Sequence, residues 1–137
     1  MKDVNSSIQK AYYDAISATG YPVYEGEEPD NETSALYIVL SDLSGVETGL
    51  KSKNAERVTI QVSIHSVKTK INNSVDLNTA ANLVLEAIKP ENFTTLTADG
   101  IQIVQINKIQ DITSRNKLGD NAFIDRRLIF SNLIHYI

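Results

Sequence analysis

The chain has 137 residues, of which 42% are hydrophobic and 22% are charged, a composition that fits one globular domain over residues 1–137. It contains no cysteine, which excludes thiolate nucleophiles, cysteine-bound metals and disulfides. The net charge of −4 argues against tight non-specific binding to nucleic acid. No apolar run has the length of a membrane span or of a secretory signal, so we expect neither membrane insertion nor secretion.

An amphipathic helix is predicted near the start of the chain. Apolar residues recur at three- and four-residue spacing between Val4 and Ile16, and Gly20 is a residue that ends helices in the left-handed conformation. A short extended piece over 21–25 follows. The segment 25–34 is acidic and holds no large apolar residue, which predicts a solvated loop.

Two strands are predicted in the middle of the chain, paired as an antiparallel hairpin. The apolar run 35–40 has the length and the β-forming residues of a buried strand. From Val58 to Ile64 apolar residues alternate with polar ones, as in a strand with one buried face. The connecting segment, roughly 42–55, is longer than a hairpin needs, and loops of this length are commonly functional or disordered.

A second helix is predicted before Pro90, followed by two strands over 101–112 and 122–137 that a polar link over 113–121 joins. The last strand exceeds the usual length of ~3–10 residues, which predicts a bulge, a bend or a portion that extends past its own sheet. The order of elements favours an α+β fold with a mainly antiparallel β-sheet, two α-helices packed on one face and a long C-terminal strand.

No arrangement of side chains predicts catalysis. The two histidines, His65 and His135, lie in predicted strands, where a solvated, hydrogen-bonded or structural histidine is favoured over a catalytic base. Arg126 and Arg127 are neighbours in a strand and face opposite sides, so at most one of them points into a given interface. We therefore expect no enzyme activity, no cofactor and no metal site.

Charge is unevenly divided along the chain. Residues 1–56 carry ten acids and four bases, a balance of −6, whereas residues 57–137 carry seven acids and nine bases, a balance of +2. An acidic face and a mildly basic face would suit head-to-tail or ring contacts between copies, while ordinary scatter of surface charge remains the other interpretation.

The elements follow one another as a helix (IQKAYYDAI), a YPVYEG piece, an acidic loop and the strand ALYIVLSDLSG. The strand ERVTIQVSIHS, the helix LNTAANLVLEAI and a long terminal strand ending LIFSNLIHYI come next. This layout resembles the tail terminator, or tail completion, proteins of long-tailed bacteriophages over nearly the whole chain.

The resemblance implies a structural subunit that closes into a hexameric ring in the tail or neck of a virion assembled in the host cytoplasm. Such a ring caps the tail tube protein and joins it to the head-tail connector or stopper protein, and DNA passes through its lumen without specific binding. Two other functions stay open. One is a different phage subunit, such as a head-side stopper or a tail tube protein, and the other is a non-phage intracellular module that binds a ligand or peptide in an apolar pocket.

Contacts with neighbouring subunits are predicted in three segments: the 42–55 loop, the 115–121 link and the long last strand, which would add to a neighbour's sheet. The candidate interface residues in these segments are Leu43, Val46, Leu50, Lys51, Lys53, Arg115, Lys117, Arg126 and Arg127.

Overall fold

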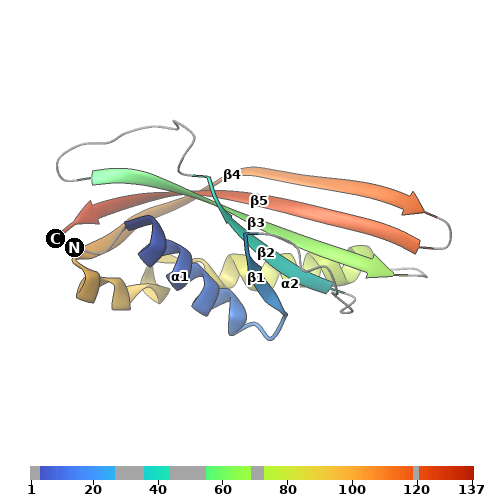
Figure 1. Cartoon of the computed structure of the whole chain (residues 1–137), viewed down its shortest axis with the longest axis horizontal. Helices are drawn as coiled ribbons and strands as arrows, with labels where there is room; N and C mark the ends of the chain where they lie inside the picture. Colours follow the sequence, from blue (N-terminus) through green and yellow to red (C-terminus); the bar gives the residue numbers. More distant parts are fainter. Residues whose placement is uncertain (1–3, 27–35, 44–54, 69–72, 119–120) are drawn as a thin grey trace.

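The computed structural model describes residues 4–26, 36–43, 55–68, 73–118 and 121–137. It confirms the α+β class, with a five-stranded sheet that carries the helices on one face (Figure 1). Within the described residues, no helix is both long enough and apolar enough to cross a membrane. The elements are α1 (Val4–Ser17), β1 (Val23–Glu25), β2 (Leu36–Asp42), β3 (Ala55–Lys68), α2 (Asn73–Ala87), the 3-10 helices η1 (Pro90–Asn92) and η2 (Thr94–Asp99), β4 (Ile101–Leu118) and β5 (Asn121–Tyr136).

The strands lie side by side in the order β1-β2-β3-β5-β4. Only the short β1 runs parallel to its neighbour, and the pairs β2/β3, β3/β5 and β4/β5 are antiparallel. This confirms the predicted β2/β3 hairpin and the mainly antiparallel sheet. The register of β3 and β5 runs without interruption from Ala55 opposite His135 to Lys68 opposite Ala122. The segment 42–55 that connects β2 to β3 lies outside the described residues except at its two ends, and the same holds for most of the acidic segment 25–34.

The hydrophobic core lies between the helices and the sheet. Ile8, Tyr12 and Ile16 of α1 are fully buried at four-residue spacing, because these positions share one face of the helix. Gly20 takes a φ of 96° just after α1, a conformation that side chains with a Cβ rarely adopt. The inward residues of β3 and one face of α2 add Val58, Ile60, Val62, Ile64, Leu77, Ala80, Ala81 and Val84 to the core.

Asn132 of β5 is a polar side chain that is completely buried within this core. Its Oδ1 accepts a hydrogen bond from the Tyr12 hydroxyl, and its Nδ2 donates to the Val58 carbonyl at 2.9 Å. The Tyr12 ring also stacks on Phe93 with 5.5 Å between the ring centres. Burial raises the pKa of the Tyr12 hydroxyl, so it remains a neutral donor. The network ties α1 to two strands, β3 and β5.

The C-terminal strands differ from the prediction in two respects. The expected polar link over 113–121 is wrong, because β4 continues to Leu118 and pairs there with Asn121 of β5. A strand can continue through polar residues when its backbone groups form hydrogen bonds with the neighbouring strand. The polar composition of 113–118 therefore did not mark the end of β4. The irregularities expected of the last strand lie instead in β4, where the ladder skips Val104 and Ile109 as two bulges.

Candidate functional site

The hairpin formed by β4 and β5 is the longest feature of the molecule, and its far end extends past the helices (Figure 1). β4 has 18 residues, which corresponds to ~60 Å of strand. Because β5 lies between β3 and β4, β4 forms one edge of the sheet, and the opposite edge is β1 with three residues. In the part of the chain that the structure describes, the sheet therefore has a single long edge.

This edge exposes large apolar side chains to solvent. Every residue over 104–117 except Ile106 is exposed, on both faces of the strand. Val104, Ile109 and Ile112 have 52%, 57% and 40% of their surface accessible. Edge strands are usually protected by charge, proline or shortness, since their unpaired N–H and C=O groups attract other chains. A long edge that exposes several large apolar side chains is a candidate surface for contact with another protein.

Both bulges of β4 occur at these exposed apolar positions. Val104 and Ile109 have no partner in the register with β5, so each is the extra residue of its bulge. A bulge bends a strand and increases its twist, and it re-aims the inserted side chain. The bulges thus place two large apolar side chains on the free edge.

A charged cluster fixes the hairpin to α2. Nε and Nη2 of Arg126 donate to the two carboxylate oxygens of Asp111 at 2.9 and 2.8 Å, and Nη1 donates to Oδ1 of Asn78 in α2 at 3.1 Å. Lys108 donates to the same carboxylate at 3.0 Å. The hydrogen bonds from Arg126, with a further one from Lys108, lower the pKa of Asp111 to about 2. We call this arrangement the Arg126 clamp; it joins β4, β5 and the helix.

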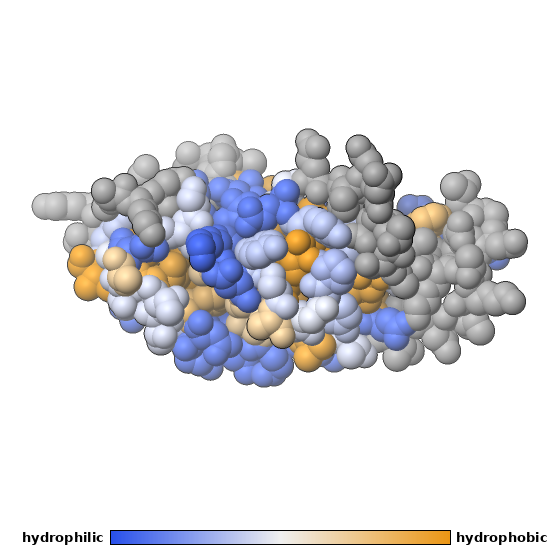
Figure 2. Space-filling view, turned by 60° about the horizontal axis from the view of Figure 1, so that its bottom comes forward, coloured by the Kyte–Doolittle hydropathy of each residue, from blue (hydrophilic) through white to orange (hydrophobic). Residues whose placement is uncertain are grey.

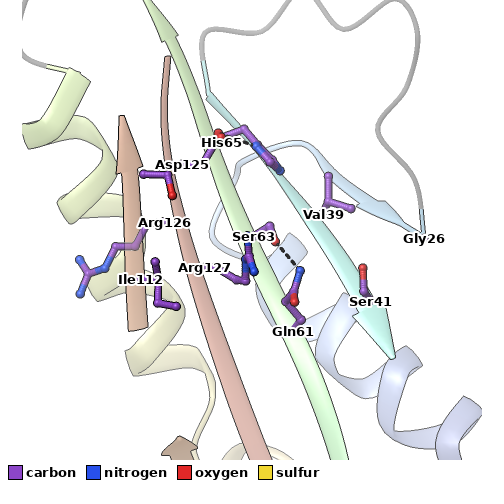
Figure 3. A pocket seen from close by; sticks show the side chains of 11 residues that line it. Gly26, Val39, Ser41, Gln61, Ser63, His65, Ile112, Asp125, Arg126 and Arg127 are labelled. Carbon is purple, nitrogen blue, oxygen red and sulfur yellow. Dashed lines mark hydrogen bonds and ion pairs between the residues drawn. The ribbon is translucent and has the colours of Figure 1, made fainter. Parts of the chain in front are cut away.

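A groove of about 270 Å³ lies on the other face of the sheet, among the residues that alternate with the core positions (Figure 3). One cross-strand row of its lining consists of Val39, Ser63, Arg127 and Ile112, from β2, β3, β5 and β4 in turn. The lining thus mixes hydroxyl, amide and apolar side chains with an imidazole, a carboxylate and two arginines, Arg126 and Arg127.

A histidine and an aspartate lie in the groove beside this cross-strand row. Nδ1 of His65 lies 2.7 Å from Oδ1 of Asp125 on the neighbouring strand (Figure 3). The imidazole stacks on Tyr37, with 5.0 Å between ring centres. His65 is therefore a hydrogen-bonded, ring-packed strand residue, which is the interpretation that the sequence favours. Over the described ranges, no three His, Asp or Glu side chains gather into a group that could hold a metal.

The structure separates the arginine pair as strand alternation predicts. Arg126 points to the helical side and is held in its clamp, whereas Arg127 points into the groove on the opposite face. Arg115 and Lys117 are exposed near the far end of β4, on the same side of that strand as Asp111. These four basic residues belong to one hairpin, and their role in an interface stays a prediction.

The remaining candidates lie around the 42–55 segment. Leu43 directly follows β2, and its backbone N–H donates to the Thr59 carbonyl at 2.9 Å. It is only half-buried, at the point where the described chain leaves the sheet. The other four candidates of this segment lie outside the described residues: Val46, Leu50, Lys51 and Lys53.

Sequence reasoning missed the clamp and the apolar edge. The partners of Arg126 are 15 and 48 residues away along the chain, so no local sequence pattern predicts these contacts. The bulges do leave a signal, because Ile103 and Val104 are adjacent and the following isoleucines recur at three-residue intervals, at 106, 109 and 112. Such spacing does not fit the two-residue period of a regular strand, and a bulge restores that period.

Comparison with known proteins relates this chain to others through its fold. No family model and no curated protein matches the sequence. A solved chain from the "Virion of native gene transfer agent (GTA) particle" superimposes with a TM-score of 0.59 at 18% identity, covering 98% of this chain and 99% of that one. A second solved chain covers 94% of this chain and 92% of its own length at 13% identity, but its TM-score of 0.49 is too low to carry an argument.

Proposed function

We propose that this chain is a structural subunit of a phage-like virion, and that it acts there as the tail terminator. In this role copies of the chain form a ring, hexameric in the proposed form, at the end of the tail tube and connect it to the head-tail connector or stopper. DNA passes through the ring without specific binding. The chain performs no bond-making step in this function.

The observation that carries the proposal is the long, exposed β4 edge in a fold shared, over almost the full length of both chains, with a subunit of a gene transfer agent virion. An ordinary monomer gains nothing from leaving Val104, Ile109 and Ile112 in solvent, since exposed apolar edges favour aggregation. A subunit that is always covered by its neighbours gains a contact surface. The projecting hairpin therefore supports an assembly protein.

The mechanism is geometric. In a ring built from head-to-tail contacts all copies point the same way along the ring axis, so the two rims present different ends of the subunit. If one rim matches the last ring of the tube and the other does not resemble a tube surface, further tube subunits find no binding site after the ring is added. Growth stops, and the second rim is left for the head connector.

The hairpin and the 42–55 segment are the parts that we assign to these contacts. Arg115 and Lys117 lie near the far end of the hairpin, where a neighbouring subunit can reach them, and the long strand β5 supports the edge over its whole length. The role of the 42–55 segment, including Lys51 and Lys53, is proposed from the sequence alone.

A tube-growth assay tests the proposal. Purified tail tube protein of the same particle is polymerised from seeds with and without this chain, and tube lengths are measured by electron microscopy. The proposal predicts short tubes with one added ring at a single end. Unchanged tube lengths with bare ends would contradict it, and a chain that forms long tubes by itself would identify a tube subunit instead.

A further inference from the structure

Opposite charges gather on two different parts of the molecule. The helical layer, which we define as residues 4–17 and 73–99, holds five acids, Asp14, Asp76, Glu86, Glu91 and Asp99, and two bases, Lys10 and Lys89. The described hairpin residues 101–118 and 121–136 hold five bases, Lys108, Arg115, Lys117, Arg126 and Arg127, and two acids, Asp111 and Asp125. Surfaces of opposite sign steer association and suppress wrong partners.

Each of these surfaces also exposes apolar side chains. The helical layer exposes Tyr13 and Leu83 by 36% and 42%, and the hairpin exposes the three apolar residues of its edge. Figure 2 shows the helical side, where hydrophobic patches are interspersed with hydrophilic ones. Apolar contact flanked by charge is the composition of an ordinary protein interface, in which burial supplies affinity and charge sets orientation.

The 3-10 part of the helical layer and the turn end of the hairpin lie toward opposite ends of the long axis. The 3-10 helices η1 and η2, with Glu91 and Asp99, lie at the end where β5 finishes, whereas the turn end of the β4–β5 hairpin lies at the other end (Figure 1). The turn end of the hairpin therefore does not reach η1 and η2 of its own copy (Figure 1). A contact between these two parts requires two copies, and such a contact can repeat head to tail.

Pairing of sheet edges between neighbouring copies explains a ring less well than a contact between the hairpin and the helical layer does. Within the described residues the only edge opposite to β4 is β1, whose three residues could pair with a small part of an 18-residue strand. Pairing of β4 with a second β4 would use the same surface on both copies, which gives a closed two-fold dimer and no ring. A head-to-tail contact of the hairpin needs a different surface, and the helical layer is the one of opposite charge.

We infer that the basic β4–β5 hairpin of one copy lies against the acidic helical layer of the next copy. The inference rests on the proposed ring and adds the two surfaces that build it. Lys117 and Arg115 face carboxylates such as Glu86 and Glu91 across the contact, and the exposed edge residues pack beside Tyr13 and Leu83. The Arg126 clamp holds the hairpin at the angle that this contact requires.

Isotope-resolved cross-linking tests which surfaces meet. Unlabelled and ¹⁵N-labelled chains are mixed, assembled as rings on tail tubes and treated with a carbodiimide, which joins lysine amines directly to carboxylates. The inference predicts mixed-isotope cross-links from Lys117 or Lys108 to Glu86, Glu91 or Asp99. Rings whose mixed-isotope cross-links avoid the helical layer would overturn it and leave the proposed function intact. An absence of rings would contradict the proposed function, and the inference would fall with it.

A charge exchange gives the matched control. The variant Arg115→Glu with Lys117→Glu changes the net charge by −4, and we expect ring yield to fall about tenfold. The control Lys2→Glu with Lys70→Glu makes the same change in net charge at two positions that belong to neither of the two surfaces defined above, and it should leave ring yield unchanged. Adding Glu86→Lys and Glu91→Lys to the hairpin variant should restore rings. Equal losses in the first variant and its control, or no restoration, would contradict the inference.

Discussion

β3 and β4 are both long strands rich in isoleucine and valine, yet they lie in opposite environments. Ile60 of β3 is fully buried beneath the helices, while Ile109 of β4 has 57% of its surface exposed. The difference arises from what covers each strand, because α2 packs on β3 and β5 and leaves the far part of β4 uncovered among the described elements. β3 contributes buried side chains to the core, and β4 exposes the surface that we propose for assembly.

β3 and α2 both support the projecting hairpin. β5 pairs with β3 on one side and with β4 on the other over most of its length. The exposed strand β4 is therefore attached through β5 to the buried strand β3. The Arg126 clamp adds a second attachment to α2 through Asn78. The hairpin is therefore supported by the core although little of β4 belongs to it.

The largest effect is expected from Ile60→Asp, which places a carboxylate in the core. Burying an unpaired charge costs about 4 kcal/mol or more, which is comparable to the whole stability of many domains of this size. We expect an unfolded or aggregated chain. Circular dichroism of the purified variant provides the measurement, and a cooperative melt near that of the wild type would show that the facing of β3 is wrong.

A smaller loss is expected from Asn132→Ala. The substitution leaves the buried Tyr12 hydroxyl without its acceptor and the Val58 carbonyl without the amide, a loss of about 2–3 kcal/mol in the free energy of unfolding. Urea denaturation measures the loss. The control Tyr12→Phe removes only the hydroxyl and should cost about 1 kcal/mol; a harmless Asn132→Ala would contradict the assigned network.

Removing Asp111 from the Arg126 clamp should lower the free energy of unfolding by less than Asn132→Ala does, and the size of this loss should depend on pH. The pKa of Asp111, about 2 in the folded chain, lies below the ordinary value of 3.8, so its contribution is present above about pH 4 and disappears as the pH falls through 2. Because this side chain is partly exposed, we expect only about 1 kcal/mol. Asp111→Asn should show that loss at pH 7, and between pH 4 and 2 it should lose less stability than the wild type, because Asp111 no longer titrates. Parallel acid titration curves for both proteins would refute the assignment.

The smallest effect on folding is expected from Ile109→Asp, the same chemical change as in β3. On the exposed edge it should alter the free energy of unfolding by less than about 0.5 kcal/mol. Ring formation on tail tubes should nevertheless fall, since a charge replaces an apolar contact. A variant that caps tubes normally would remove the edge from the interface, and one that unfolds would place Ile109 in the core.

The parts of the fold that the sequence predicts are those governed by local periodicity. The spacing of Ile8, Tyr12 and Ile16 and the alternation in β3 each report which face is buried, and both were confirmed. The extent of β4 was not predictable from composition, because pairing with β5 decides it. The clamp of Arg126 on Asp111 and Asn78 was out of reach as well, since three elements must pack before these side chains meet.

The central claim is that the chain closes the end of a tail tube as a ring. Cryo-electron microscopy of the intact particle tests it most directly, by fitting the helix-covered sheet and its projecting hairpin into density. The account predicts one ring of this fold between the tail tube and the head connector. Density for this fold along the length of the tube, or in no part of the particle, would contradict it.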